Sequence, residues 1–166
     1  HNIGGIANLS FLDKNKGFDD VLAFDTGPGN MMINAATSYY YGQPYDDNGS
    51  YARQGILIED LFKELQENPY YDVAPPKSTG REMFGEVVLE PILKHYENRK
   101  NDVIYTLTKF TAWTIQDSYR KFLPHDLDQI IISGGGAYNP VLMYEIRAYL
   151  PEYQVLTQED LGFSSD

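Results

Sequence analysis

The chain has 166 residues with 24 acidic and 13 basic side chains, a net charge of −11, and no cysteine. The acidic surplus argues against a nucleic-acid partner, because phosphate backbones are bound by clustered Lys and Arg, and against an anionic membrane surface. The lack of cysteine excludes disulfides and thiolate chemistry, and there is neither a run of about 20 apolar residues nor a signal-peptide pattern. We expect a cytoplasmic protein, in which the acidic surplus serves solubility.

The length fits one domain or one lobe of a larger protein. The chain begins with His1 at what reads as the start of a strand, and it stops at Asp166 without a C-terminal element. We expect residues 1–166 to form a single α/β domain that is truncated at both ends.

Hydrophobic periodicity predicts strands that alternate with helices, which is typical of an α/β protein with a mixed sheet. The first strand is interrupted by Gly4-Gly5, and the second ends at Asp25, where a turn leads into a helix. A segment with three prolines, 67–82, is long for a simple connector, and such loops are often functional. Near the end, Asn139-Pro140 has the residue types of a helix N-cap and first position. In chain order the predicted elements are strands at 1–13 and 21–25 joined by a hairpin turn at 14–20, helices at 30–41, 57–65, 84–96 and 102–122, a strand at 130–132, a helix at 140–150 and a strand at 153–157.

Three segments place glycines directly after a predicted strand. Glycine at such a turn lets a ligand reach backbone N–H groups, and a helix N-terminus that follows adds the positive end of a dipole, which suits phosphate. No segment matches the P-loop or G-x-G-x-x-G patterns, so each of them taken alone is more often only a turn. The three segments are Gly4-Gly5, Gly27-Pro28-Gly29 and Gly134-Gly135-Gly136.

Asp25 stands directly before one of these turns, and its residue type allows two interpretations. It is either a turn or N-cap acid that accepts hydrogen bonds from the amides of Gly27 or Asn30, or a general base. An acid at the carboxyl end of a strand faces the crevice where α/β proteins bind ligands, and there it can take a proton from a hydroxyl or from water.

Four motifs occur in one order along the chain: "NIGGIANLSFL", "FDTGPGNMMIN", "PPKSTGRE" and "SGGGAYNPVLM". Together they resemble the anhydro-N-acetylmuramic acid kinases, which belong to the sugar kinase/actin/heat-shock-ATPase superfamily. The resemblance extends over nearly the whole chain. It implies a ribonuclease-H-like mixed sheet flanked by helices, forming one lobe, mostly the C-terminal one, of a two-lobe actin-like ATPase fold.

The resemblance also implies a function. The family phosphorylates 1,6-anhydro-N-acetylmuramic acid from ATP and opens the anhydro ring with water, giving N-acetylmuramic acid 6-phosphate for peptidoglycan recycling. By this resemblance Asp25 is the catalytic base that takes a proton from the attacking water. The partners are then the amino sugar and ATP, with Mg²⁺ accompanying the nucleotide and no protein ligand for the metal assigned, and the assembly is a homodimer. The implied nucleotide contacts are Gly4, Gly5, Gly134, Gly135, Gly136 and Asn139, and the implied sugar contacts are Thr26, Gly27, Gly29 and Asn30, with the glycines leaving room for the ligand.

Lys77 and Arg81 in "PPKSTGRE" are candidate partners for the lactyl carboxylate of the sugar or for a phosphate. The alternative is that the arginine fastens the loop to the domain. His95 and His125 have no visible partner in sequence and are expected at the surface.

Two departures from the family matter. The N-terminal "G-T-S-x-D-G" phosphate loop is absent, and so is the Glu-Ala helix that follows the last segment in relatives. We therefore expect the isolated 166 residues to have little or no kinase activity. Two competing hypotheses stay open: another sugar kinase of the superfamily, in which Asp25 deprotonates a sugar hydroxyl directly, and a non-catalytic ligand-sensing or oligomerisation domain, in which Asp25→Asn changes nothing.

Overall fold

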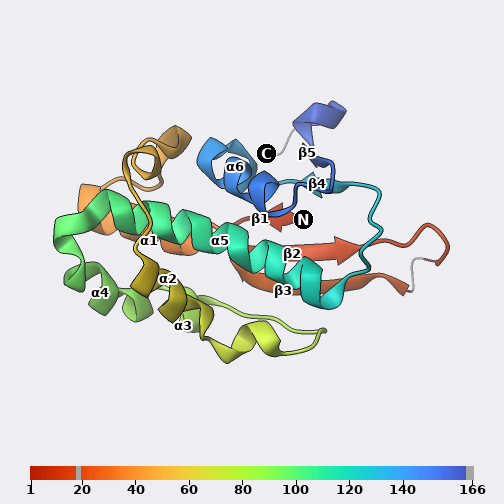
Figure 1. Ribbon diagram of the computed structural model, residues 1–166, viewed down its shortest axis with the longest axis horizontal. Coiled ribbons are helices and arrows are strands. Elements are labelled where there is room, and N and C mark those ends of the chain that lie inside the picture. The colour runs from red at the N-terminus through yellow and green to blue at the C-terminus, as the bar shows by residue number, and fades with distance from the viewer. Residues whose placement is uncertain (18–19, 164–166) are drawn as a thin grey trace.

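A mixed five-stranded layer organises the computed structural model, which describes residues 1–17 and 20–163 (Figure 1). The strands β1 (Asn2–Ile3), β2 (Ile6–Phe11) and β3 (Leu22–Pro28) pair antiparallel, whereas β4 (Ile130–Ile132) and β5 (Val155–Thr157) pair parallel. A parallel bridge between Asn2 and Ser133 joins the two sheets, and the Ile3 N–H donates to the Ser133 carbonyl at 2.8 Å. The order across the layer is β3-β2-β1-β4-β5. This arrangement confirms the predicted mixed sheet of ribonuclease-H type.

Six α-helices pack around this layer in the described part of the chain, together with short 3₁₀ turns. The long helix α5 crosses in front of β2 and β3, with α6 beside it (Figure 1). The helices are α1 (Met31–Tyr41), α2 (Glu59–Gln66), α3 (Arg81–Phe84), α4 (Glu86–His95), α5 (Lys100–Phe122) and α6 (Pro140–Tyr149). Five of these helices confirm the predictions, whereas α3 was not predicted, because it begins within the segment 67–82 that was expected to be an irregular loop. No helix within 1–17 and 20–163 has both the length and the apolar character that a bilayer crossing needs.

One face of the sheet is buried beneath α5 and α6. Ile3, Leu9 and Phe24 on the strands pack in one cluster with Ile115 of α5 and Ile146 of α6. Each such side chain contributes about 1.5–3 kcal/mol when fully buried. On the strands the neighbouring residues point the opposite way, because side chains alternate across a strand. The helices therefore cover one face of β1–β3 and leave the other open.

Local capping explains where two of the helices begin or end. The Asn139 side-chain oxygen accepts hydrogen bonds from the backbone N–H groups of Val141 (3.1 Å) and Leu142 (3.2 Å), so the predicted N-cap of α6 is confirmed. Gly42 ends α1 in the left-handed conformation with φ 66°, which glycine adopts without a steric penalty. Both signals are local, which is why they could be found in the sequence.

The structure corrects the predictions for three segments. The segment 1–13 is a hairpin of two strands rather than one bent strand, because the chain reverses at Gly4-Gly5. β3 continues past Asp25 to Pro28, since it stays paired with β2 as far as Ile6. Ile58, not Leu57, is the buried residue before α2. The predicted hairpin turn at 14–20 includes Phe18 and Asp19, which lie outside the described residues.

Candidate active site at the carboxyl ends of the strands

The three glycine turns predicted from the sequence meet at one edge of the sheet. β1, β3 and β4 run in the same direction, because β1 and β3 are both antiparallel to β2 and β4 is parallel to β1. The turns therefore follow strands whose carboxyl ends share one edge, which is where α/β sheets bind ligands. The turns also touch: the N–H of Gly29 donates to the Gly5 carbonyl at 2.8 Å, and that of Asn30 donates to the Gly4 carbonyl at 2.7 Å.

The amides at the start of α1 are consequently not open to a ligand, contrary to the expectation for a strand–glycine–helix turn. The N–H groups of Gly29, Asn30 and Met31 all donate to the carbonyls of Gly4 and Gly5. Open amides lie on the other two turns instead. Gly5 and Gly135 are exposed, and their N–H groups donate to no acceptor within residues 1–17 and 20–163. Two exposed donors on adjoining turns suit the oxygens of a phosphate.

Gly27 and Gly29 are buried, and packing within the chain accounts for both. A Cβ at Gly29 would lie 2.1 Å from the Gly4 carbonyl oxygen, and one at Gly27 (φ 151°) would lie 3.2 Å from the Tyr71 ring. Gly29 thus allows the turn after β3 to dock on the turn after β1, and Gly27 allows β3 to pack against the Tyr71 ring. Their predicted contact with a sugar, and the room that they leave for it, stay predictions, but packing within the chain already disfavours a Cβ at both positions.

Replacing Gly29 by alanine is expected to lower the free energy of unfolding by about 3 kcal/mol, because the Cβ collides with backbone that cannot move aside without separating the two turns. Gly5→Ala is the matched control on the facing turn, since its Cβ would meet only the Met31 methyl at 3.7 Å. Urea unfolding of both variants measures the difference. Equal midpoints for the two variants would contradict this account of Gly29.

Asp25 lies within β3 rather than at its end, and a β-bulge sets its direction. Ala7 pairs with Gly27 and Asn8 pairs with Asp25, so Thr26 is an extra residue on β3. Thr26 is fully buried, and its hydroxyl lies 3.3 Å from the Ala7 carbonyl and 3.1 Å from Nε2 of His1. Bulges of this kind often re-aim a side chain beside an active site. Here Asp25 points to the face that the helices leave open. The predicted sugar contact of Thr26 stays a prediction, although its side chain has no exposed surface.

The loop around 70–80 holds Asp25 by three hydrogen bonds. The Asp25 N–H donates to the Lys77 carbonyl (3.1 Å), the Tyr70 hydroxyl donates to the Asp25 carbonyl (2.7 Å), and the Thr79 N–H donates to the Asp25 carboxylate (3.0 Å). The carboxylate accepts no hydrogen bond from Gly27 or Asn30, so the turn-acid interpretation is wrong. Its second oxygen has no partner within the described part of the chain. A carboxylate held by one oxygen and free at the other has the geometry of a general base.

Lys77 and Arg81, both predicted as ligand contacts, differ in their surroundings. The Lys77 ammonium donates to the Tyr70 carbonyl at 2.9 Å and lies 4.5 Å from the Tyr70 ring centre and 4.8 Å from that of Phe122. Desolvation lowers the pKa of Lys77, with the charge of Lys121 adding to the effect. Lys77 therefore fastens the loop through cation–π contacts. Arg81 is exposed and has no ion-pair partner among the residues described, so its guanidinium is available to an anion.

A pocket of about 400 Å³ lies next to the glycine turns. Its walls come from the first turns of α1, from the loop at 45–48 and from the segment that leads into α6. The volume is in the range of small-molecule sites. Asp46 is buried and its carboxylate already accepts hydrogen bonds from the N–H groups of Tyr51 and Ala52, which leaves Asp47 as the exposed acid. The lining residues are Asn30, Ile33, Asn34, Tyr45, Asp46, Asp47, Asn48, Gly135, Tyr138 and Asn139.

The pocket brings together several residues that sequence analysis assigned to different ligands. Asn30, predicted to contact the sugar, lies beside Gly135, predicted to contact the nucleotide: a Cβ on Gly135 would be 3.6 Å from the Asn30 amide nitrogen. Asn139 lines the same pocket while capping α6. Gly134 and Gly136 pack against β1. The 45–48 loop was not among the predicted site residues, and only the fold brings it to the pocket.

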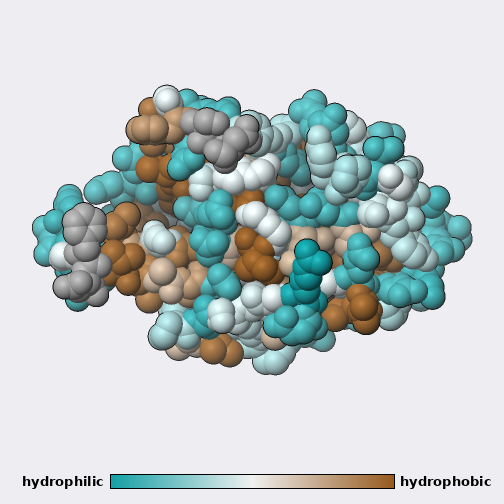
Figure 2. Space-filling view, turned by 180° about the vertical axis from the view of Figure 1, so that it is seen from behind, coloured by the Kyte–Doolittle hydropathy of each residue, from teal (hydrophilic) through white to brown (hydrophobic). Residues whose placement is uncertain are grey.

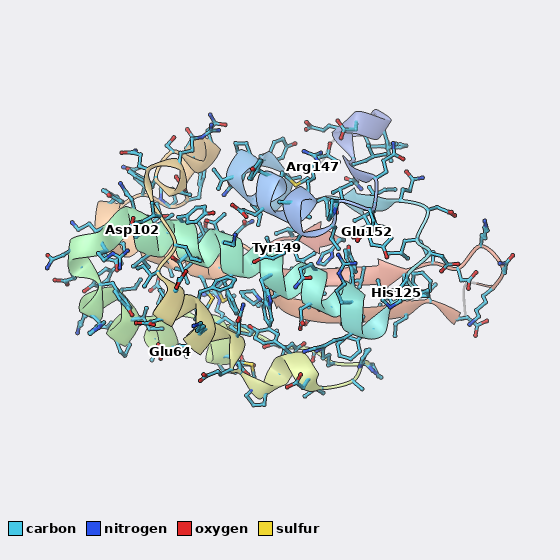
Figure 3. All side chains as sticks on the ribbon, viewed as in Figure 1. Glu64, Asp102, His125, Arg147, Tyr149 and Glu152 are labelled. Atoms are coloured by element: carbon cyan, nitrogen blue, oxygen red, sulfur yellow. The ribbon has the colours of Figure 1, made fainter. Side chains whose placement is uncertain are left out.

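The remaining titratable candidates are structural or peripheral. His95 and His125 are exposed as predicted, and His125 lies in the turn after α5 (Figure 3). Figure 3 also shows Asp102 at the start of α5, where its carboxylate accepts a hydrogen bond from the Ile56 N–H at 2.8 Å. Within residues 1–17 and 20–163 no cluster of three or more His, Asp or Glu side chains could hold a metal ion. The described donors therefore do not form a protein cage for Mg²⁺.

Comparison with known proteins gives a consistent result over the whole chain. The family model described as "Anhydro-N-acetylmuramic acid kinase" matches residues 1–166. A protein of that name from Francisella tularensis subsp. novicida (strain U112) is 50% identical over 169 residues, covering 100% of this chain and 44% of the relative. Relatives of the same name from Clostridioides difficile (strain 630) and Bacillus cereus (strain G9842) are 46% and 40% identical, each over 99% of this chain and 44% of the relative. The chain thus spans less than half the length of these curated relatives.

Proposed function

Because the chain belongs to the anhydro-N-acetylmuramic acid kinase family, we propose that it forms the acid-bearing, mostly C-terminal lobe of an ATP-dependent anhydro-sugar kinase. The substrate is 1,6-anhydro-N-acetylmuramic acid, and the product is N-acetylmuramic acid 6-phosphate. The observation that carries the proposal is Asp25, whose carboxylate is held by the Thr79 N–H at 3.0 Å on the open face of the sheet. The cytoplasmic location, the homodimer and the role in peptidoglycan recycling follow from the resemblance of the motifs.

In the proposed reaction the free oxygen of Asp25 takes a proton from a water molecule. The oxygen of that water forms a bond to the anomeric carbon of the sugar as the bond from this carbon to O6 breaks. The electron pair released onto O6 then attacks the γ-phosphate, and ADP leaves. The protein contributes a base and fixed positions, and positioning and charge stabilisation account for most of the catalysis of phosphoryl transfer.

The glycine turns supply the proposed nucleotide site. The exposed amides of Gly5 and Gly135 suit the phosphates, and the pocket beside them suits the nucleoside, with Asn139 in its wall. Mg²⁺ is proposed to enter with the phosphates and to keep water as its other ligands, since Mg²⁺ gives up water reluctantly. No protein ligand for the metal is assigned.

Arg81 is the proposed partner of the lactyl carboxylate of the sugar. It is exposed, it lies two residues after Thr79, which holds Asp25, and it forms no ion pair with a described residue. A guanidinium binds a carboxylate through two parallel hydrogen bonds. Lys77 is left out of this role because its ammonium is occupied by Tyr70 and Phe122.

The test is turnover of ATP and the anhydro-sugar by the complete protein that carries this chain, in water enriched in ¹⁸O. Ring opening by water places one heavy oxygen at C1 of the phosphorylated product. A product without the heavy oxygen would replace the proposal by an ordinary sugar kinase, in which Asp25 deprotonates a hydroxyl. Absence of turnover would reject the kinase assignment for this protein.

A further inference from the structure

A row of polar side chains crosses the open face of the sheet. The pairing registers place Asn2 opposite Asn8, and Asn8 opposite Asp25, so the three side chains stand side by side on β1, β2 and β3. Directly opposed residues point to the same face. Asn2 and Asn8 are exposed, whereas their strand neighbours Ile3 and Ala7 are fully buried. The row is therefore a surface feature, with Asp25 at one end.

The other end of the row reaches the glycine turns. The hydroxyl of Ser133, the residue after β4, donates to the Asn2 side-chain oxygen at 3.4 Å, and the chain then turns through Gly134 and Gly135. With strands about 4.8 Å apart, the distance across the row from Asp25 to Asn2 is roughly 10 Å. That is about the length of a sugar ring plus one phosphate. Asn8 lies in the middle of this span, between Asn2 and Asp25.

The chemistry of this face suits the uncharged polar groups of a ligand. Seen from behind α5, its residues are a mixture of hydrophilic and apolar types rather than one large apolar patch (Figure 2). A carboxamide such as that of Asn8 offers two donors and an acceptor without charge, which matches the hydroxyl and amide groups of an N-acylated sugar. The Asn8 side chain makes no hydrogen bond to the described residues, so these groups are free.

We propose that Asn8 is a substrate-contacting residue, which binds the sugar between Asp25 and the phosphate-facing amides of Gly5 and Gly135. The proposal rests on the proposed function, because it takes the anhydro-sugar as the ligand. It assigns to the "NIGGIANLSFL" segment a sugar contact in addition to its nucleotide-facing glycines. By binding the sugar, Asn8 sets the position of the ring on the sheet. The anomeric carbon then lies close enough to Asp25 for a water molecule between them to be deprotonated.

The experiment compares Asn8→Ala with Ser10→Ala in the complete protein. Ser10 is the matched control, because it is exposed on the same face of β2, two residues farther from the glycine turns. We expect Asn8→Ala to raise the KM for the sugar by about tenfold, the value of a lost hydrogen bond, and to leave the KM for ATP unchanged. Ser10→Ala should change neither. A merely structural role would not separate the two KM values.

The outcomes distinguish this inference from the proposed function. An active wild-type protein in which Asn8→Ala behaves like Ser10→Ala would overturn the role of Asn8 and leave the kinase assignment intact. An equal rise in both KM values would also overturn it, since that pattern reports a distorted site. A wild-type protein that neither turns over nor, by calorimetry, binds the anhydro-sugar would reject the proposed function and this inference together.

Discussion

Asp25→Asn is expected to lower kcat of the complete protein by at least about 10²-fold, because the amide cannot accept the proton of the attacking water. The substitution is nearly isosteric, and the asparagine side-chain oxygen can still accept the Thr79 N–H that holds the loop at 3.0 Å. The backbone bonds of residue 25 to Lys77 and Tyr70 are also retained. The loss should therefore appear in kcat with little change in thermal stability.

Asp72→Asn is the matched control for this prediction. Asp72 belongs to the same loop region, but it is exposed and forms an ion pair with Lys121 at 2.8 Å. Exposed ion pairs contribute little to stability, so this variant should keep its activity and most of its stability. If Asp25→Asn were as active as Asp72→Asn, the base would have to be another group, and Asp25 would return to a purely structural role.

Local patterns in the sequence were sufficient to predict the helices that surround the site. Three-to-four-residue periodicity located α1, α2, α4, α5 and α6, and Asn139-Pro140 marked the start of α6. These signals lie within a few residues of the structure they determine. The motifs around Asp25 indicated the family for the same reason, since each is a continuous stretch of chain.

The side chains that complete the site depend on pairing between distant segments. Asn8 has the local signature of an exposed strand residue, yet its position beside Asp25 follows only from the register of β2 with β3. The bulge at Thr26 has no local signal, because threonine fits a regular strand equally well. Register and bulges are set by the whole sheet, so a single sequence does not reveal them.

At Gly29 a contact within the fold accounts for a residue that the sequence analysis assigned to a ligand. Gly29 was predicted as a special position, but the atom that requires glycine there is the Gly4 carbonyl oxygen, 25 positions earlier in the chain. Lys77 is a similar case, because the Phe122 ring that it contacts lies 45 positions later. In both cases a contact within the fold has the same sequence signature as a contact with a ligand.

The folded chain is expected to lose stability steeply above pH 10, because four tyrosines are buried as neutral phenols. Tyr40, Tyr70, Tyr71 and Tyr119 are at most 9% exposed, and burial raises the pKa of each. The unfolded chain releases these protons from about pH 10, whereas the folded chain retains them, so the unfolded state binds fewer protons and stability falls as the pH rises. Below pH 10 both states hold the protons and the effect vanishes.

Each proton that the folded chain retains lowers the free energy of unfolding by up to about 1.4 kcal/mol per pH unit. Four such protons lower it by up to about 5 kcal/mol per pH unit, whereas the total free energy of unfolding of a domain is about 5–15 kcal/mol. We expect cooperative unfolding within about one to three pH units above pH 10, with circular dichroism and tyrosinate absorbance changing together.

Tyr71→Phe is the informative variant, because the Tyr71 hydroxyl is buried with no hydrogen-bond partner among the described residues. Its removal should leave stability at pH 7 unchanged or raised by about 1 kcal/mol and should make the alkaline transition less steep by one proton. Tyrosinate absorbance that develops fully while the helical signal persists would show that these phenols ionise in the folded protein, contrary to their burial.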